Sequence, residues 1–161
     1  MQIPVPFHRP RVRAPSAQRA FTLVEVLIAV VLVATLAAVA YPSYVRHVEK
    51  ARVRSAISDI QKIEMVMERY FSDHYEFPPT LAHAGLALTD PWGNPYKYLR
   101  LSAGTIGKAR KDKSLVPINS DYDLYSMGAD GKTAAALTAK VSQDDVIRAS
   151  NGSFHGLGSD Y

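Results

Sequence analysis

One apolar stretch constrains this chain more than any other feature. From Val26 to Ala40 the only polar residue is Thr35, and the apolar character continues through Val45. A run of this length is sufficient to cross a bilayer as a helix. Its single charge is Glu25, near its start, and a carboxylate in hydrocarbon is costly unless it has a partner. We therefore expect Glu25 to have a specific role.

The charge distribution argues against nucleic-acid binding. The chain of 161 residues has a formal net charge of +4 and no cysteine. Four arginines precede the apolar run and no acidic residue occurs before Glu25, so the rest of the chain is balanced, with 15 basic and 15 acidic residues. Basic residues flanking a span stay on the cytoplasmic side, so we expect the part after the run to lie on the other side of the membrane.

Residues 1–20 are rich in Pro and Arg and show neither a helical nor a strand period. They are typical of a targeting or processing segment. An ordinary secretory signal is cut after its apolar stretch, but here Tyr41 and Pro42 follow at once. Hydropathy alone favours an uncleaved signal anchor.

The residues at the border favour another interpretation. The sequence Arg19-Ala-Phe-Thr-Leu-Val-Glu25, followed by the apolar run, resembles the prepilin-type signal. The resemblance implies that a membrane peptidase cuts between Ala20 and Phe21 and methylates the new amino terminus at Phe21. The family has a Glu at the fifth residue after the cut and a Pro near the twenty-second, which Glu25 and Pro42 match. One departure is Ala20, where the family usually has Gly.

This processing gives Glu25 a partner. Cleavage creates an α-amine at Phe21, and Glu25 of one subunit is expected to pair with that amine on a neighbour during assembly. A charge that is unfavourable in lipid is then satisfied inside a filament. The alternative is that Glu25 lies at the headgroup level without a partner.

Beyond the span the pattern becomes amphipathic. Pro42 removes a backbone donor, so we expect a kink or local melting of the helix there. Apolar residues then recur at three- and four-residue spacing as far as Phe71, which predicts a second helical segment over 46–77, ended by Phe77-Pro-Pro79. The Met65 and Met67 pair is interpreted as core packing.

The remaining residues, 78–161, are expected to form a β-rich globular part. A short helix or turn is predicted around 81–88, strands are predicted at 96–101 and 121–127, and Gly128-Ala-Asp-Gly131 is predicted to be a turn. Residues 102–120 are predicted to be a solvated loop with a basic cluster, and the tail from Asp144 is polar and glycine-rich. The basic cluster consists of Lys108, Arg110, Lys111 and Lys113.

Two blocks identify a narrower resemblance. Asp90-Pro-Trp-Gly-Asn-Pro-Tyr-Lys-Tyr98 and Tyr125-Ser-Met-Gly-Ala-Asp-Gly131 are similar to the major pseudopilins, the G subunits of type II secretion systems. The resemblance implies an α+β pilin fold, with a long N-terminal helix, transmembrane in its first half, packed on a small antiparallel sheet. The expected parts are a leader at 1–20, an assembly helix at 21–45, an amphipathic helix at 46–77 and the periplasmic part at 78–161.

The same resemblance implies a function. The expected protein is a structural subunit that polymerises through its helix into a pseudopilus and helps to drive export through the outer membrane. The implied partners are further copies of itself, minor pseudopilins, the prepilin peptidase and an inner-membrane platform with a cytoplasmic ATPase. The expected location is the bacterial inner membrane, in a single pass with the N-terminus cytoplasmic, and then the periplasmic filament.

Two alternatives remain open at this point. One is a type IV pilin of a surface fibre for adhesion, motility or DNA uptake, although such pilins usually carry a disulfide loop and this chain has no cysteine. The other is an uncleaved, membrane-anchored periplasmic binding module. The five histidines lack metal-ligand spacing, and no nucleophile elbow or phosphate loop is present, so catalysis is not expected.

Finally, the resemblance implies a calcium site in the C-terminal loop. The ligands that carry over are the Met127 carbonyl and the Asp130 carboxylate, with a second carboxylate from Asp144 or Asp145. Ca²⁺ accepts six to eight oxygen ligands, including backbone carbonyls. The family's short link is replaced here by the longer segment 132–143. Alternatively, Asp130 belongs only to a turn, and Asp144-Asp145 is a helix start or a solvated pair.

Overall fold

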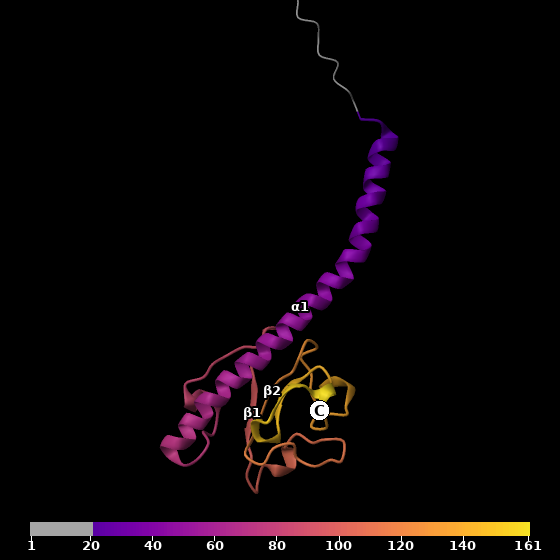
Figure 1. Ribbon diagram of the computed structural model, residues 1–161. Helices are drawn as coiled ribbons and strands as arrows, with labels where there is room; N and C mark the ends of the chain where they lie inside the picture. Colours follow the sequence, from indigo (N-terminus) through magenta and orange to yellow (C-terminus); the bar gives the residue numbers. More distant parts are fainter. Residues whose placement is uncertain (1–20) are drawn as a thin grey trace, which may run out of the picture. The chain divides into compact units, whose positions relative to one another are not determined.

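The computed structural model describes residues 21–161. The chain divides into two units, Met1–Pro42 and Ser43–Tyr161, of which the first is described from residue 21 onward. The leader at 1–20, including Ala20, lies outside the described residues. Figure 1 shows one long helix, α1, followed by a small sheet and extended loops.

Helix α1 runs from Leu23 to His74. It remains helical through Pro42, so the local melting that was one expectation at this residue does not occur, while a kink stays a prediction. The helix ends where Tyr75 adopts a positive φ of 58°, a conformation that a bulky side chain rarely takes within regular structure. The predicted end at Phe77 is therefore three residues too late.

The second unit is built on the buried face of α1. Ala56, Ile60, Ile63 and Met67 follow one another at four- and three-residue spacing, and all four are fully buried. They form one hydrophobic cluster with apolar residues of the sheet and its approach, namely Tyr96, Tyr122, Leu124 and Val146. The amphipathic pattern and the interpretation of Met67 as a core residue are thus confirmed, whereas the same interpretation of Met65 is wrong, because Met65 lies off this face and is 66% exposed.

The sheet has four antiparallel strands in the order β1-β2-β3-β4. These are β1 (Lys97–Arg100), β2 (Tyr122–Ser126), β3 (Val146–Ala149) and β4 (Phe154–Leu157). The first two were predicted from their alternation, whereas β3 and β4 lie in the tail that the sequence marked only as polar and glycine-rich. Five short 3-10 helices occupy the connections: η1 (Leu81–Ala84), η2 (Ile106–Lys108), η3 (Lys140–Ser142), η4 (Ser150–Gly152) and η5 (Gly158–Asp160).

Alternation along the strands supplies two separate cores. Tyr122, Leu124 and Val146 pack with the cluster on α1, while Ile147 and Ala149 pack with loop residues Ile118 and Leu137 in a second cluster. Successive side chains of a strand point to opposite faces, so each face of the sheet is covered, one by the helix and one by the loops. This arrangement confirms the α+β expectation.

Candidate functional site

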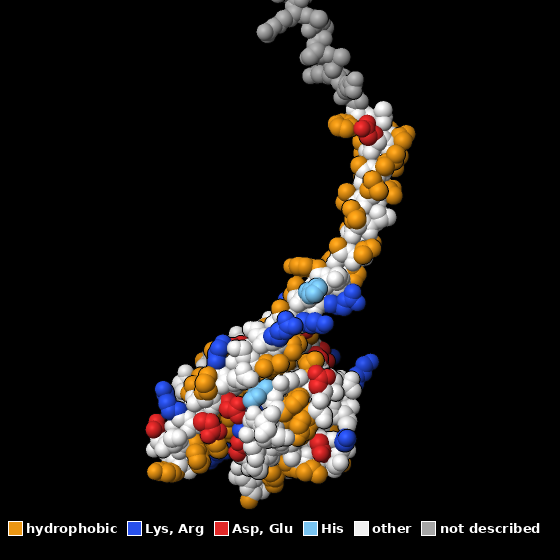
Figure 2. Space-filling model, in the orientation of Figure 1, with side chains coloured by type: hydrophobic (Ala, Val, Ile, Leu, Met, Phe, Trp, Pro, Cys, Tyr) orange, Lys and Arg blue, Asp and Glu red, His pale blue; other side chains and the backbone are white. Residues whose placement is uncertain are grey.

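The apolar part of α1 is exposed within the chain. The helix is long and apolar enough to cross a membrane, and none of its most apolar 18-residue window is buried. Figure 2 shows hydrophobic side chains around this stretch. Leu36 and Val39, for example, are 71% and 77% exposed. Because exposing so much apolar surface to water is unfavourable, this stretch requires either lipid or other helices around it.

The one polar side chain within the apolar run, Thr35, is hydrogen-bonded inside the helix. The Thr35 hydroxyl donates to the carbonyls of Val31 and Leu32, at 3.0 and 2.8 Å. Back-bonding of this kind hides a hydroxyl in an apolar setting. Thr35 therefore adds no unpaired polar group to the surface of the helix.

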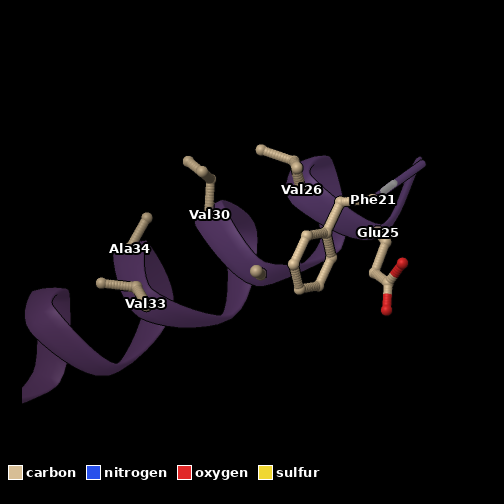
Figure 3. A pocket seen from close by; sticks show the side chains of 7 residues that line it. Phe21, Glu25, Val26, Val30, Val33 and Ala34 are labelled. Atoms are coloured by element: carbon tan, nitrogen blue, oxygen red, sulfur yellow. The ribbon is translucent and has the colours of Figure 1, made fainter. Parts of the chain in front are cut away.

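Glu25 lies in the first turn of α1. The backbone N–H of Glu25 donates to the Thr22 hydroxyl at 3.2 Å, so Thr22 caps the helix. Thr-x-x-Glu is the sequence of a capping box, of which the structure shows the half made by the Thr22 hydroxyl. Figure 3 shows the Glu25 carboxylate beside the Phe21 ring, at one end of an apolar groove that continues along the helix. An exposed carboxylate at a helix N-terminus is free to accept a cation.

A second group of charges fastens α1 to the sheet. Arg148 of β3 is 1% exposed, and its Nε donates to Glu64 of α1 at 2.7 Å. The other oxygen of Glu64 lies 2.7 Å from Nε2 of His155 on β4. The Arg148 guanidinium also lies over the Tyr122 ring, 4.1 Å from its centroid. This network joins one helix residue to two strands, so it fixes where the helix lies on the sheet.

The structure brings Asp130 and Asp144 together through the backbone of Asp130, while the Asp130 carboxylate accepts a hydrogen bond from the backbone N–H of Lys132 at 2.7 Å. The backbone N–H of Asp130 donates to Oδ2 of Asp144 at 3.1 Å. Gly128 has a positive φ of 62°, and a Cβ at this position would collide with the backbone carbonyl oxygen of Asp144. Asp144 therefore lies directly against the 128–131 turn. Oxygen donors gathered around a glycine turn suit Ca²⁺ better than softer metals.

Asp145 lies in a different environment. It is buried, and its Oδ2 accepts hydrogen bonds from Arg110 Nη2 and the Thr133 hydroxyl, both at 2.7 Å. Burial raises the pKa of the Asp145 carboxyl, and the bonds from Thr133 and Arg110 oppose that rise. Asp145 and Arg110 therefore form a buried ion pair. Among residues 21–161, no group of three or more His, Cys, Asp or Glu side chains is arranged to hold a metal.

Arg110 corrects the expectation of a fully solvated basic loop. It is 3% exposed, and its guanidinium lies 4.2 Å from the centroid of the Tyr125 ring. Its backbone N–H donates to Asp123 at 2.6 Å. The loop is therefore held on the sheet by one internal cation, whereas Lys108 and Lys113 are exposed as predicted.

Glu64 and Arg148 were not among the residues expected to have a role, and Arg110 was expected only as part of a solvated basic cluster. A lone Glu within an amphipathic helix carries no signal, because most such residues are solvated. The short motif Val146-Ile-Arg-Ala149 places an arginine between apolar residues, which is the one hint that this arginine is buried. Its partners are far away in the sequence and no spacing rule reveals them.

Comparison with known proteins adds independent findings. Residues 15–41 match the family model described as the prokaryotic N-terminal methylation motif. The type II secretion system core protein G of Pseudomonas aeruginosa is 32% identical over 139 residues, covering 71% of this chain and 86% of the relative. The proteins of the same name from Aeromonas hydrophila and Escherichia coli K12 are 31% and 29% identical, covering 85% and 88% of those relatives and 71% and 74% of this chain. No solved structure matches the chain.

Proposed function

Because this chain belongs to the type II secretion system core protein G family of major pseudopilins, we propose that it is cut before Phe21 and polymerised through its N-terminal helix. The chain is a structural subunit of a secretion pseudopilus and is anchored in the cell envelope by one apolar helix. The proposed orientation has the N-terminus in the cytoplasm and the unit Ser43–Tyr161 in the periplasm.

The observation that carries this proposal is the exposed apolar stretch of α1 with one carboxylate at its start. Lipid covers the stretch before assembly, and the helices of neighbouring subunits cover it afterwards, so the apolar surface avoids water in both states. The Glu25 carboxylate then accepts the α-amine of a neighbour's Phe21. An ion pair formed inside a helix bundle replaces an unpaired charge in hydrocarbon, which favours the assembled state.

The proposed partners follow from this cycle. A prepilin peptidase acts on the Ala20–Phe21 bond, minor pseudopilins share the filament, and an inner-membrane platform with a cytoplasmic ATPase supplies the work. The subunit itself has a structural and not a catalytic role. Its contribution is a rigid globular unit attached to a helix that polymerises.

Mass spectrometry of the N-terminus tests the proposed processing. In cells that contain a prepilin peptidase, the mature chain is expected to begin with N-methyl-Phe21. Ala20→Gly should process at least as well as the natural chain, and Ala20→Phe should block cleavage. Recovery of the full-length chain alone would support an uncleaved anchor instead. A deletion strain separates the two filament types, because loss of secretion indicates a pseudopilus and loss of surface fibres indicates a pilus.

We also propose a calcium site at the 127–131 turn, formed by the carboxylates of Asp130 and Asp144 with the Met127 carbonyl. Bound Ca²⁺ would supply a cation that neutralises these carboxylates and stabilises the loop by linkage. Asp145 is not included, because it is paired with Arg110. Thermal melting of the protein in calcium and in chelator tests the site. We expect calcium to raise the midpoint, Asp144→Asn to remove the rise, and the exposed control Asp160→Asn to keep it. An unchanged midpoint would mean that the turn binds no calcium.

A further inference from the structure

A row of cations follows the apolar run on α1. Arg46, Lys50 and Arg54 are spaced four residues apart, so they lie on one face of the helix, and all three are exposed. Figure 2 shows Lys and Arg side chains gathered along this part of α1. The three side chains line a groove of about 370 Å³, whose other lining residues are Glu49, Val53 and Leu157. We call these three residues the cationic ridge.

Within the described residues, the charges of the cationic ridge are not neutralised by ion pairs. Among residues 21–161, no ion pair involves Arg46, Lys50 or Arg54. The one carboxylate of the groove, Glu49, accepts a hydrogen bond from Trp92 Nε1 at 2.9 Å and lies 3.7 Å from Arg52. Its charge is therefore compensated by groups outside the ridge, and the groove keeps a positive balance.

The cationic ridge directly follows the stretch of α1 that is long and apolar enough to cross a membrane. The apolar run ends at Val45, so Arg46 is the next residue. Nine helical residues from Arg46 to Arg54 rise about 12 Å, and the headgroup layer beyond the hydrocarbon is about 5–8 Å thick on each side. Because Lys and Arg side chains extend along a surface while keeping their charge in a polar layer, all three can reach phosphates.

We propose that the cationic ridge binds the headgroup phosphate of an anionic phospholipid in the leaflet at which the apolar run ends. The groove offers such a lipid two complementary surfaces. The three cations face the phosphate, and Val53 with Leu157 of β4 forms an apolar floor for the glycerol and the first methylenes of the acyl chains. An acidic surface on a second copy would match the charges but would leave the apolar floor uncovered, and the membrane is present before any filament forms.

Headgroup binding has a functional consequence beyond polymerisation. A subunit held by lipid headgroups has its globular unit tethered to the surface until it is extracted. Each cation near an anionic surface favours binding by about fivefold. Extraction into a filament would therefore be harder from a leaflet rich in anionic lipid than from a zwitterionic one.

The test uses the full chain in neutral detergent micelles, titrated with short-chain phosphatidylglycerol or with phosphatidylcholine of the same chain length. The single tryptophan, Trp92, is bonded to Glu49 of the groove and reports binding by its fluorescence. We expect phosphatidylglycerol to bind at least about tenfold more tightly than phosphatidylcholine. The triple variant Arg46→Gln, Lys50→Gln, Arg54→Gln should lose this preference.

Two controls make the result specific. Lys108→Gln, Lys113→Gln and Lys140→Gln remove the same charge from exposed positions elsewhere, and this variant should keep the preference. Arg46→Lys with Arg54→Lys retains the charge and should also bind. Equal affinity for the two lipids, displacement by inorganic phosphate at matched concentration, or retention of the preference in the triple variant would overturn the proposal. Loss of self-association without any lipid effect would assign the ridge to a contact between copies and would also overturn it.

Discussion

The guanidinium of Arg148 and the carboxylate of Asp121 are joined by two parallel hydrogen bonds, from Nη1 to Oδ1 at 2.9 Å and from Nη2 to Oδ2 at 2.7 Å. Side-by-side pairing of this kind is the strongest geometry available to an arginine and a carboxylate. The remaining guanidinium nitrogen, Nε, donates to Glu64. Arg148 thus has two acidic partners, one directly before β2 and one on α1.

Replacing Arg148 with Met should strongly destabilise the globular unit. The variant leaves Asp121 without its cation and Glu64 with His155 alone, both in a largely buried setting, and we expect a loss of about 3–5 kcal/mol in the free energy of unfolding. Denaturant titration followed by circular dichroism measures it. Lys62→Gln is the matched control, because Lys62 pairs with Asp59 at 3.0 Å while 63% exposed. Its loss should stay below about 0.5 kcal/mol, and equal losses would contradict the assigned role of Arg148.

Gly128→Ala should also destabilise the protein, through the backbone. Gly128 has a positive φ, and the added Cβ would meet the Asp144 carbonyl, a backbone atom that cannot move without shifting the approach to β3. A loss greater than about 1 kcal/mol is expected. Gly104→Ala is the control, because a Cβ there meets nothing within 4 Å. A thermal melt that distinguishes the two variants would support the close approach, and identical midpoints would contradict it.

Glu25→Ala should leave the globular unit folded and impair polymerisation. Glu25 precedes every residue of the two cores, so its removal does not change the packing of the sheet. The amine at the processed N-terminus would lose its proposed partner. Filament yield from sheared cells measures assembly, and circular dichroism of the purified subunit measures folding. A normal yield of filaments would exclude pairing with the amine as a requirement.

A chain that lacks residues 1–45 should be soluble and largely monomeric. The first residue of the hydrophobic core is Ala56, so this truncation removes no core side chain and discards the apolar stretch. Size-exclusion chromatography with light scattering gives the oligomeric state. Persistent oligomers would indicate that the globular units associate on their own.

The sequence was sufficient to predict the parts of the fold that repeat locally. The spacing of Ala56, Ile60, Ile63 and Met67 specifies one helix face, and alternation specifies β1 and β2. Strand β4 was not predicted because a glycine such as the buried Gly156 is typical of loops, and only pairing with β3 makes this segment a strand. A four-residue strand has too few alternations to be read as a period.

The candidate sites likewise differ in whether a local stretch of sequence is enough to predict them. Glu25 was predicted because a single charge at the start of an apolar run is visible in the sequence itself. The ion pair between the buried Arg110 and Asp145 joins residues that lie 35 positions apart, so no local pattern predicts it. Basic residues clustered in a loop are usually solvated. That expectation was wrong for Arg110, which is enclosed by the loop and the sheet.

Glu64 contacts Arg148 of β3 and His155 of β4, which lie 84 and 91 residues farther along the chain. A polypeptide delivered from its N-terminus presents α1 long before either partner exists, and closing so large a loop is slow. The globular unit therefore completes its folding only when the end of the chain has arrived. Until then Glu64 has neither of these partners and the core face of the helix is open to proteases. A subunit that lacks β3 and β4 is therefore expected to be degraded more readily than a complete one.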